Sequence, residues 1–162
     1  MKLVGRVVPS STVSPICLHS EATLQQGEEG VVTGWGKTRA TSSHLSNCLR
    51  AVKLPYWDQP DCQEAFKYSS QRILPEMLCA GSPGVDSCDG DSGGPLAGFI
   101  DGNYRLVGII SWGFGCGGVR FQLGLTEREK YFYVCFQSET PGVNTRVQPY
   151  LAWIQEKMKL LH

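Results

Sequence analysis

The feature that most constrains this chain of 162 residues is a glycine-rich run at residues 86–95, which reads DSCDGDSGGP. Glycine, aspartate and proline favour a tight turn, and an apolar, strand-like segment follows directly. Such a turn displays the side chain of Ser92 on exposed backbone. Glycine on both sides lets neighbouring N–H groups converge on one developing oxyanion, where each donor lowers the barrier by about 3–4 kcal/mol. The run therefore predicts Ser92 as a nucleophile, with the N–H groups of Gly90 and Ser92 as an oxyanion hole.

The flanks of the run separate this interpretation from its alternative, an ordinary glycine-rich surface turn. Asp86 and Cys88 precede the Gly-Asp-Ser-Gly-Gly-Pro motif, and Ser-Trp-Gly follows it at 111–113. With these flanks, the chain resembles the C-terminal half of a chymotrypsin-family serine protease of the trypsin-like kind, peptidase S1. The resemblance covers nearly all of residues 1–117 and 140–162, and it implies a hydrolase that uses no cofactor.

The resemblance implies an all-β fold, namely the second six-stranded antiparallel barrel of the chymotrypsin-like fold, with a short intermediate helix and a C-terminal helix. The residues agree, because strand-type segments separated by turn residues recur along the chain. Asp101-Gly102 suits a tight hairpin turn, and Asp58 with Pro60 suits the start of a helix. The predicted strands are 30–36, 48–55, 74–80, 95–100 and 104–112, and the predicted helices are 58–67 and 150–161.

The domain organisation is also predicted. Residues 1–26 hold prolines and serines without sustained alternation, which indicates a linker, and the resemblance makes it the remnant of the crossing between two barrels. Residues 27–162 then form the C-terminal barrel, and the first barrel is expected to be missing. An atypical insertion at about 118–139 stands where relatives place only a few residues. We interpret it as translated sequence foreign to the fold, or as an extra loop beside the pocket.

The resemblance also predicts a substrate pocket. Asp86 stands where trypsin-like relatives place the base of the specificity pocket, and a buried carboxylate there selects Lys or Arg side chains; an exposed loop aspartate is the alternative. The segment 111–113 is predicted as an edge strand that pairs with substrate backbone. Asn144 stands where many relatives have Tyr at the pocket floor. The predicted substrate-binding residues are Asp86, Ser111, Trp112, Gly113 and Gly142.

Asp91 has a separate role in the family, where it forms an ion pair with the α-amino group made by activation cleavage. This sequence has no internal Ile-Val-Gly-Gly-like start. We therefore expect Asp91 to lack its charged partner, which is costly for a buried carboxylate, and to leave a collapsed, zymogen-like oxyanion hole. A turn aspartate without such a role is the alternative.

Seven cysteines without Cys-x-x-Cys or zinc-ligand spacing predict a disulfide framework and no metal site. The resemblance implies that Cys17 tethers a pro-segment and that Cys48 reaches the missing first barrel, with a buried thiol as the alternative for each. Gly30 and Gly98 stand where many relatives carry a further bridge. The disulfides implied by the resemblance are Cys62–Cys79 and Cys88–Cys116.

A serine hydroxyl needs a base and an orienting carboxylate, which the family supplies from first-barrel segments that do not occur here. We interpret His19, His44 and His162 as solvated surface histidines. The complete protein is thus expected to be an endopeptidase that cleaves after Lys or Arg, and this chain a truncated, inactive form. The alternatives are a non-catalytic homologue or decoy that binds peptides or inhibitors, and an unstable fragment.

Charge and hydropathy exclude other classes of partner. The 15 basic and 15 acidic residues cancel and no basic run occurs, so nucleic acid and anionic membranes are not expected as partners. No apolar run approaches the roughly 18 residues of a membrane span, and no signal peptide is visible. The expected partners are peptide or protein substrates with Lys or Arg, and protease inhibitors. The resemblance implies an extracellular, secreted protein.

Overall fold

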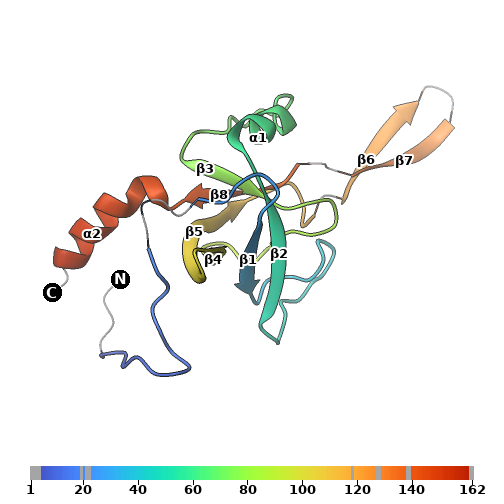
Figure 1. Ribbon diagram of the computed structural model, residues 1–162. Helices are drawn as coiled ribbons and strands as arrows, with labels where there is room; N and C mark the ends of the chain where they lie inside the picture. Colours follow the sequence, from blue (N-terminus) through green and yellow to red (C-terminus); the bar gives the residue numbers. More distant parts are fainter. Residues whose placement is uncertain are drawn as a thin grey trace.

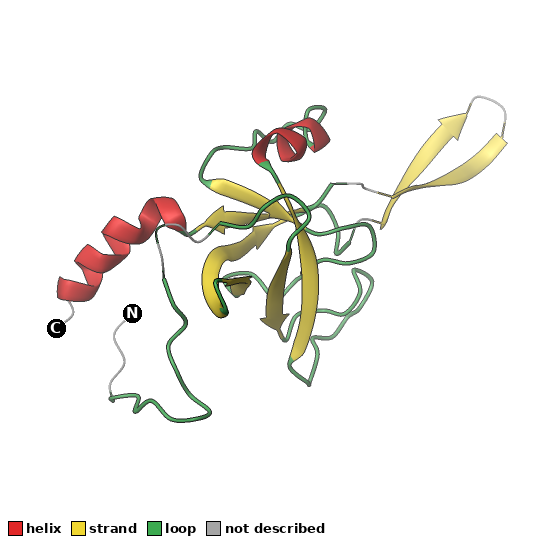
Figure 2. Ribbon diagram, in the orientation of Figure 1, coloured by secondary structure: helices red, strands yellow, loops and turns green. Residues whose placement is uncertain are grey.

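The computed structural model describes residues 5–18, 20, 23–117, 119–126, 129–137 and 140–160. Six strands close an antiparallel barrel in the order β1-β2-β3-β8-β5-β4, which confirms the predicted all-β class (Figures 1 and 2). A short helix precedes β3 in sequence, and a second helix ends the chain, as predicted. The barrel strands are β1 (Glu29–Gly34), β2 (Arg50–Trp57), β3 (Met77–Ala80), β4 (Pro95–Ile100), β5 (Asn103–Trp112) and β8 (Gly142–Arg146), and the helices are α1 (Gln59–Ala65), the 3₁₀ turn η1 (Gln148–Tyr150) and α2 (Leu151–Leu160).

Local signals place two of these elements as the sequence predicts. The side chain of Asp58 caps α1 by accepting a hydrogen bond from the N–H of Asp61 at 3.0 Å. Asp101 and Gly102 both have positive φ, 50° and 77°, in the two-residue turn between β4 and β5. Each device needs only neighbouring residues, which is why the sequence suffices to predict it.

The core of the barrel is apolar and takes side chains from strands β1, β2, β3, β4 and β5. Its side chains are inward-facing residues of the alternating strand pattern, together with one residue that lies outside the strands, Leu24. The buried cluster comprises Leu24, Val32, Leu54, Tyr56, Leu78, Ala80, Leu96, Val107 and Ile110.

Leu24 explains why two glycines face each other across β1 and β4. Gly30 and Gly98 are directly paired in the antiparallel ladder, and the Leu24 side chain, 7% exposed, lies against both. A Cβ on Gly98 would come within 2.9 Å of Leu24 Cδ2, and one on Gly30 within 2.7 Å of Leu96 Cδ1. Apolar packing therefore occupies the place where a disulfide would need side-chain atoms. Residues 1–26, which were expected to form a linker, therefore include a residue of the barrel core, Leu24.

The helical spacing of Leu151, Ile154, Met158 and Leu161 predicts that one face of α2 packs, but the structure shows burial only at the start of the helix. Leu151 is buried and Ile154 is partly buried, but Met158 is 53% exposed, and Leu161 lies outside the described residues. Figure 1 shows the helix extending away from the barrel. Because apolar spacing marks a face without showing what covers it, the packing prediction is wrong for the last two turns of this helix.

Residues in the expected insertion form a hairpin of their own. Strands β6 (Val119–Thr126) and β7 (Glu129–Gln137) pair only with each other, from Val119 opposite Gln137 to Thr126 opposite Glu129. The hairpin projects from the barrel in Figure 1. It leaves the six-stranded order uninterrupted, so β5 and β8 still pair directly although the hairpin separates them in sequence.

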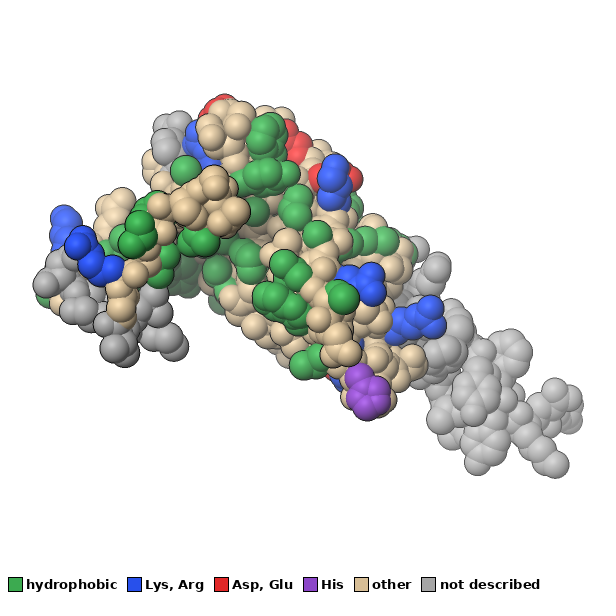
Figure 3. All heavy atoms as spheres, turned by 90° about the horizontal axis from the view of Figure 1, so that it is seen from below, with side chains coloured by type: hydrophobic (Ala, Val, Ile, Leu, Met, Phe, Trp, Pro, Cys, Tyr) green, Lys and Arg blue, Asp and Glu red, His purple; other side chains and the backbone are tan. Residues whose placement is uncertain are grey.

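Apolar side chains remain on the outer surface, and several are visible over the barrel in Figure 3. The most exposed large apolar residues include Val8, Tyr68, Phe99, Trp153 and Leu160.

None of the helices in the described part of the chain is long and apolar enough to span a bilayer.

We predict that Leu24→Ala destabilises the barrel by about 2–5 kcal/mol, because the deleted atoms leave a cavity between two glycines that cannot fill it. The free energy of unfolding, measured in urea, tests this. Leu18→Ala is the matched control, since Leu18 is exposed and lies outside both apolar clusters. Equal losses in the two variants would contradict the assigned role of Leu24.

Candidate active site

The loop that carries Ser92 consists of two consecutive turns. The N–H of Asp91 donates to the carbonyl of Cys88, and the N–H of Gly94 donates to the carbonyl of Asp91, both at 2.9 Å. Gly90 has φ 96°, a value that other residues rarely adopt. Ser92 is exposed between the two turns, as expected for a displayed side chain.

Strand β5 anchors the end of this loop. Gly93 donates its N–H to the carbonyl of Ile110 at 2.8 Å, and the N–H of Ile110 donates to the carbonyl of Gly94 at 3.0 Å. By contrast, the N–H groups of Gly90 and Ser92 donate to no acceptor among the described residues. The two amides predicted for an oxyanion hole are therefore unoccupied donors on a loop that is otherwise hydrogen-bonded.

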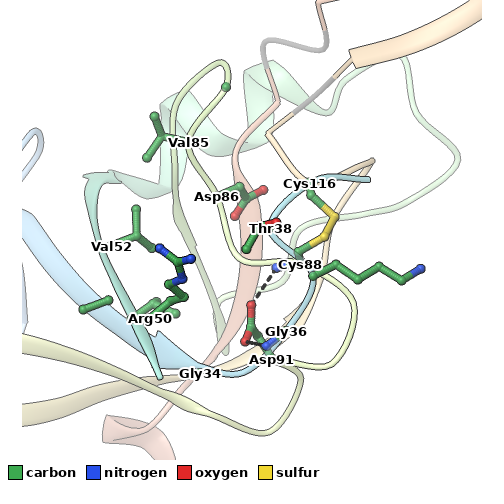
Figure 4. Close-up of a pocket in the computed structure, with 14 residues that line it drawn as sticks. Gly34, Gly36, Thr38, Arg50, Val52, Val85, Asp86, Cys88, Asp91 and Cys116 are labelled. Carbon is green, nitrogen blue, oxygen red and sulfur yellow. Dashed lines mark hydrogen bonds between the residues drawn. A yellow bond between two sulfur atoms is a disulfide. The ribbon is translucent and has the colours of Figure 1, made fainter. Parts of the chain in front are cut away.

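The Asp91 carboxylate ties the loop to the end of β1. Its Oδ1 accepts the N–H of Gly36 at 2.7 Å, and its Oδ2 accepts the N–H of Cys88 at 3.0 Å (Figure 4). None of the salt bridges within the described residues involves Asp91, and the two backbone donors solvate its carboxylate.

The contact between Gly36 and Asp91 was not predicted from the sequence. A Cβ on Gly36 would lie 2.5 Å from Asp91 Oδ1, so the carboxylate can approach only glycine at that position. The signal was present as Gly34-Trp35-Gly36 at the end of a predicted strand, where glycine marks a close approach of another group. Nothing local, however, identified the group as Asp91.

A cavity of about 270 Å³ lies beside Ser92. It brings together the predicted nucleophile, the predicted specificity carboxylate Asp86, and the predicted substrate-binding segment of β5 and the residue after it. Gly142 borders the Asp86 carboxylate from β8, where a Cβ would come within 2.5 Å of Oδ1. The cavity is lined by Asp86, Ser87, Cys88, Asp89, Ser92, Ile110, Ser111, Trp112, Gly113, Gly115 and Cys116.

Asp86 is largely enclosed by backbone. Its Oδ1 accepts the N–H of Ser87 at 2.7 Å, and the absence of a side chain on Gly142 leaves the room that the carboxylate occupies. Burial raises the pKa of Asp86 from 3.8 to about 6, although the backbone N–H groups of Ser87 and Gly117 act in the opposite direction. None of the salt bridges within the described residues involves Asp86.

A second cavity, of about 240 Å³, lies on the other side of Asp86. Figure 4 shows Asp86 and Asp91 lining it together with Arg50 of β2. The Cys88–Cys116 disulfide borders both cavities and joins the two loops that form them.

The cysteine predictions divide into two groups. Cys62–Cys79 and Cys88–Cys116 are disulfides, as predicted. Cys17 and Cys48 are free and exposed, so the alternative of a buried thiol is wrong for both. Cys17 is held at the barrel surface through its carbonyl, which accepts the N–H of Leu106 at 3.0 Å.

The remaining candidates that the structure describes, His44 and Asn144, do not line the cavity beside Ser92. His44 is exposed and does not line it, while His19 and His162 fall outside the described residues. Asn144 is 3% exposed and donates to the carbonyl of Gly142 at 3.4 Å, so this amide turns back on its own strand. Within the described ranges, no three His, Cys, Asp or Glu residues are grouped to hold a metal ion.

Comparison with known proteins gives a consistent result. The family model described as Trypsin matches residues 1–154. The chain is 37% identical over 152 residues to Serine proteinase stubble of Drosophila melanogaster, 35% over 157 to Trypsin-1 of Astacus astacus, and 35% over 162 to Transmembrane protease serine 9 of Rattus norvegicus. These matches cover 91%, 96% and 98% of this chain but 17%, 56% and 13% of the relatives. The chain thus spans less than two thirds of each relative.

We predict that Asp86→Asn changes how stability depends on pH. Because the native pKa of about 6 exceeds 3.8, the native state retains a proton that the unfolded state releases. The parent should therefore lose stability as pH rises from 3.8 to about 6, by about 2–4 kcal/mol, and remain at the lower value above that range. The asparagine variant should lack this loss. Urea unfolding across the range tests it, and parallel pH profiles would contradict the burial of a protonated Asp86.

Proposed function

Because the chain belongs to the trypsin family of serine proteases, we propose that it is the part of an endopeptidase that carries the nucleophile and the pocket for a Lys or Arg side chain. The observation that carries the proposal is the shared cavity of Asp86 and Ser92. A side chain that reaches the buried carboxylate enters the same cavity that Ser92 lines.

The selection of a cation follows from the state of Asp86. Its carboxylate is enclosed by glycine backbone, and burial raises its pKa to about 6. A Lys ammonium or Arg guanidinium in the cavity would restore favourable electrostatics and lower that pKa, whereas an acidic or apolar side chain would not. Discrimination therefore comes from the cost of leaving the ionised carboxylate unpaired.

The proposed chemistry is acyl transfer to Ser92. Its Oγ would attack the carbonyl carbon of the peptide bond, and the free N–H groups of Gly90 and Ser92 would stabilise the developing oxyanion. The attack requires a base that accepts the serine proton and a carboxylate that orients the base. We assign neither role to His44, which does not line the cavity. The chain by itself is proposed to bind basic peptides without rapid hydrolysis.

A decoy that binds substrates or inhibitors is the second candidate function. The same two observations favour it, namely a cavity with a buried carboxylate and the absence of His44 from its lining. In the endopeptidase proposal the complete protein supplies the base; in the decoy proposal nothing does.

Activation is proposed to involve the cavity of about 240 Å³. The Asp91 carboxylate already accepts two backbone hydrogen bonds, and an α-ammonium group would add a charged donor to it. That ion pair would further restrain the loop that presents Gly90 and Ser92. The proposed links of Cys17 and Cys48 to a pro-segment and a first barrel use thiols that are exposed and free.

Two further proposals concern the compartment in which the protein resides and the insertion at residues 118–139. Its two disulfides suit an oxidising, extracellular compartment. Residues 118–139 are proposed to be an insertion carried by the pocket rim, because the chain enters them just after Cys116 and returns just before Gly142.

We predict that benzamidine, a planar cation, binds the parent chain in calorimetric titration and that Asp86→Asn weakens binding by at least about 30-fold, because the Asp86 carboxylate is the proposed charge partner of a cation in the cavity. Affinity should increase as pH rises through about 6, where Asp86 ionises. A serine-directed phosphonylating probe should label Ser92 no faster than a free hydroxyl.

Ser92→Ala, which removes the labelled hydroxyl, is the control for the probe, and Glu64→Gln on α1 is the control for net charge. Benzamidine binding that survives Asp86→Asn would refute the pocket. Rapid labelling of Ser92 would refute the proposal that the chain lacks an effective base.

A further inference from the structure

A second carboxylate borders the cavity beside Ser92. Asp89 lines it together with Asp86, but its side chain is 71% exposed, whereas Asp86 is largely buried. Asp89 lies between Cys88 and Gly90, on the loop that presents Ser92. The cavity therefore has one carboxylate at its enclosed end and another where it opens to solvent.

Asp89 already binds an alkylammonium group. Lys37 Nζ lies 2.9 Å from Asp89 Oδ2, and the backbone N–H of Lys37 donates to the carbonyl of Asp89, also at 2.9 Å. Lys37 lines the cavity of about 240 Å³, whereas Asp89 lines the one beside Ser92, so the ion pair joins a residue of each cavity. The ion pair shows that a lysine-type cation fits against Asp89.

This ion pair can exchange without moving the loop. One partner is largely exposed, and ion pairs at a surface contribute little and are screened by salt. The Asp89 side chain can turn between staggered rotamers. The hydrogen bond between the two backbones and the bonds of Asp91 stay in place when the side chains separate.

We propose that Asp89 is a specificity-determining residue that favours ligands with two cationic groups, one at Asp86 and the other at the open end of the cavity. Lys37 is then an internal competitor that a ligand cation displaces from Asp89. The inference rests on the proposed function of the pocket and deepens it. The ligand class is a peptide with a second basic side chain near the one that enters the cavity, or a small dication of matching length.

The test compares monocations and dications of equal size. Benzamidine, bis-benzamidines with progressively longer alkyl linkers, and linker-matched monobenzamidines with a neutral end are titrated calorimetrically into the full chain. The readout is the ratio of the dissociation constants of the matched monocation and dication. We expect the parent to prefer one linker length, Asp89→Asn to reduce its ratio about two- to fivefold, and Lys37→Met to increase it by a similar factor.

Glu64→Gln is the control for net charge, because Glu64 is an exposed acid on α1 that does not line the cavity. The preference for the dication should shrink as salt is added, since the open end is exposed. Melting temperatures of all variants check the fold. If benzamidine binds and the ratio is the same in the parent and Asp89→Asn, the inference about Asp89 is overturned and the proposed pocket stands. If benzamidine does not bind the parent, both are overturned.

Discussion

The carboxylate of Asp91 joins two parts of the chain that are 55 residues apart. By accepting the N–H groups of Gly36 and Cys88, it fixes the loop of Ser92 against the end of β1, while β5 holds the far side of that loop. A buried carboxylate is tolerated only when such donors solvate it. The positions of Ser92 and of the two amides proposed for the oxyanion hole depend on this contact.

The pocket, too, depends on a close approach that a larger side chain would block. Gly142 at the start of β8 leaves space that the Asp86 carboxylate fills. Burial then raises its pKa to about 6, and the proposed selection of a cation rests on this cost of ionisation. The barrel supports this geometry with an apolar core that Leu24 completes, and the Cys88–Cys116 disulfide joins the two loops of the cavity.

The sequence predicts features whose chemistry is local or whose family pattern is specific. The cap at Asp58, the Asp101-Gly102 turn, both disulfides and the six-stranded barrel belong to this class. Long-range partners were not predictable, because no local pattern shows that Gly36 faces Asp91 or that Leu24 packs between two glycines. The exposure of Met158 was missed for the same reason, since helical spacing does not reveal what covers a face.

Hydrolysis of an arginine ester by the purified full chain tests the central claim most directly. The claim is that the chain holds a nucleophile and a cation pocket but no base that activates Ser92. At a pH where Asp86 is ionised, we predict that the parent and Ser92→Ala hydrolyse the ester at the same slow rate. Turnover by the parent at the roughly 1–10³ s⁻¹ typical of enzymes, abolished in Ser92→Ala, would contradict the account.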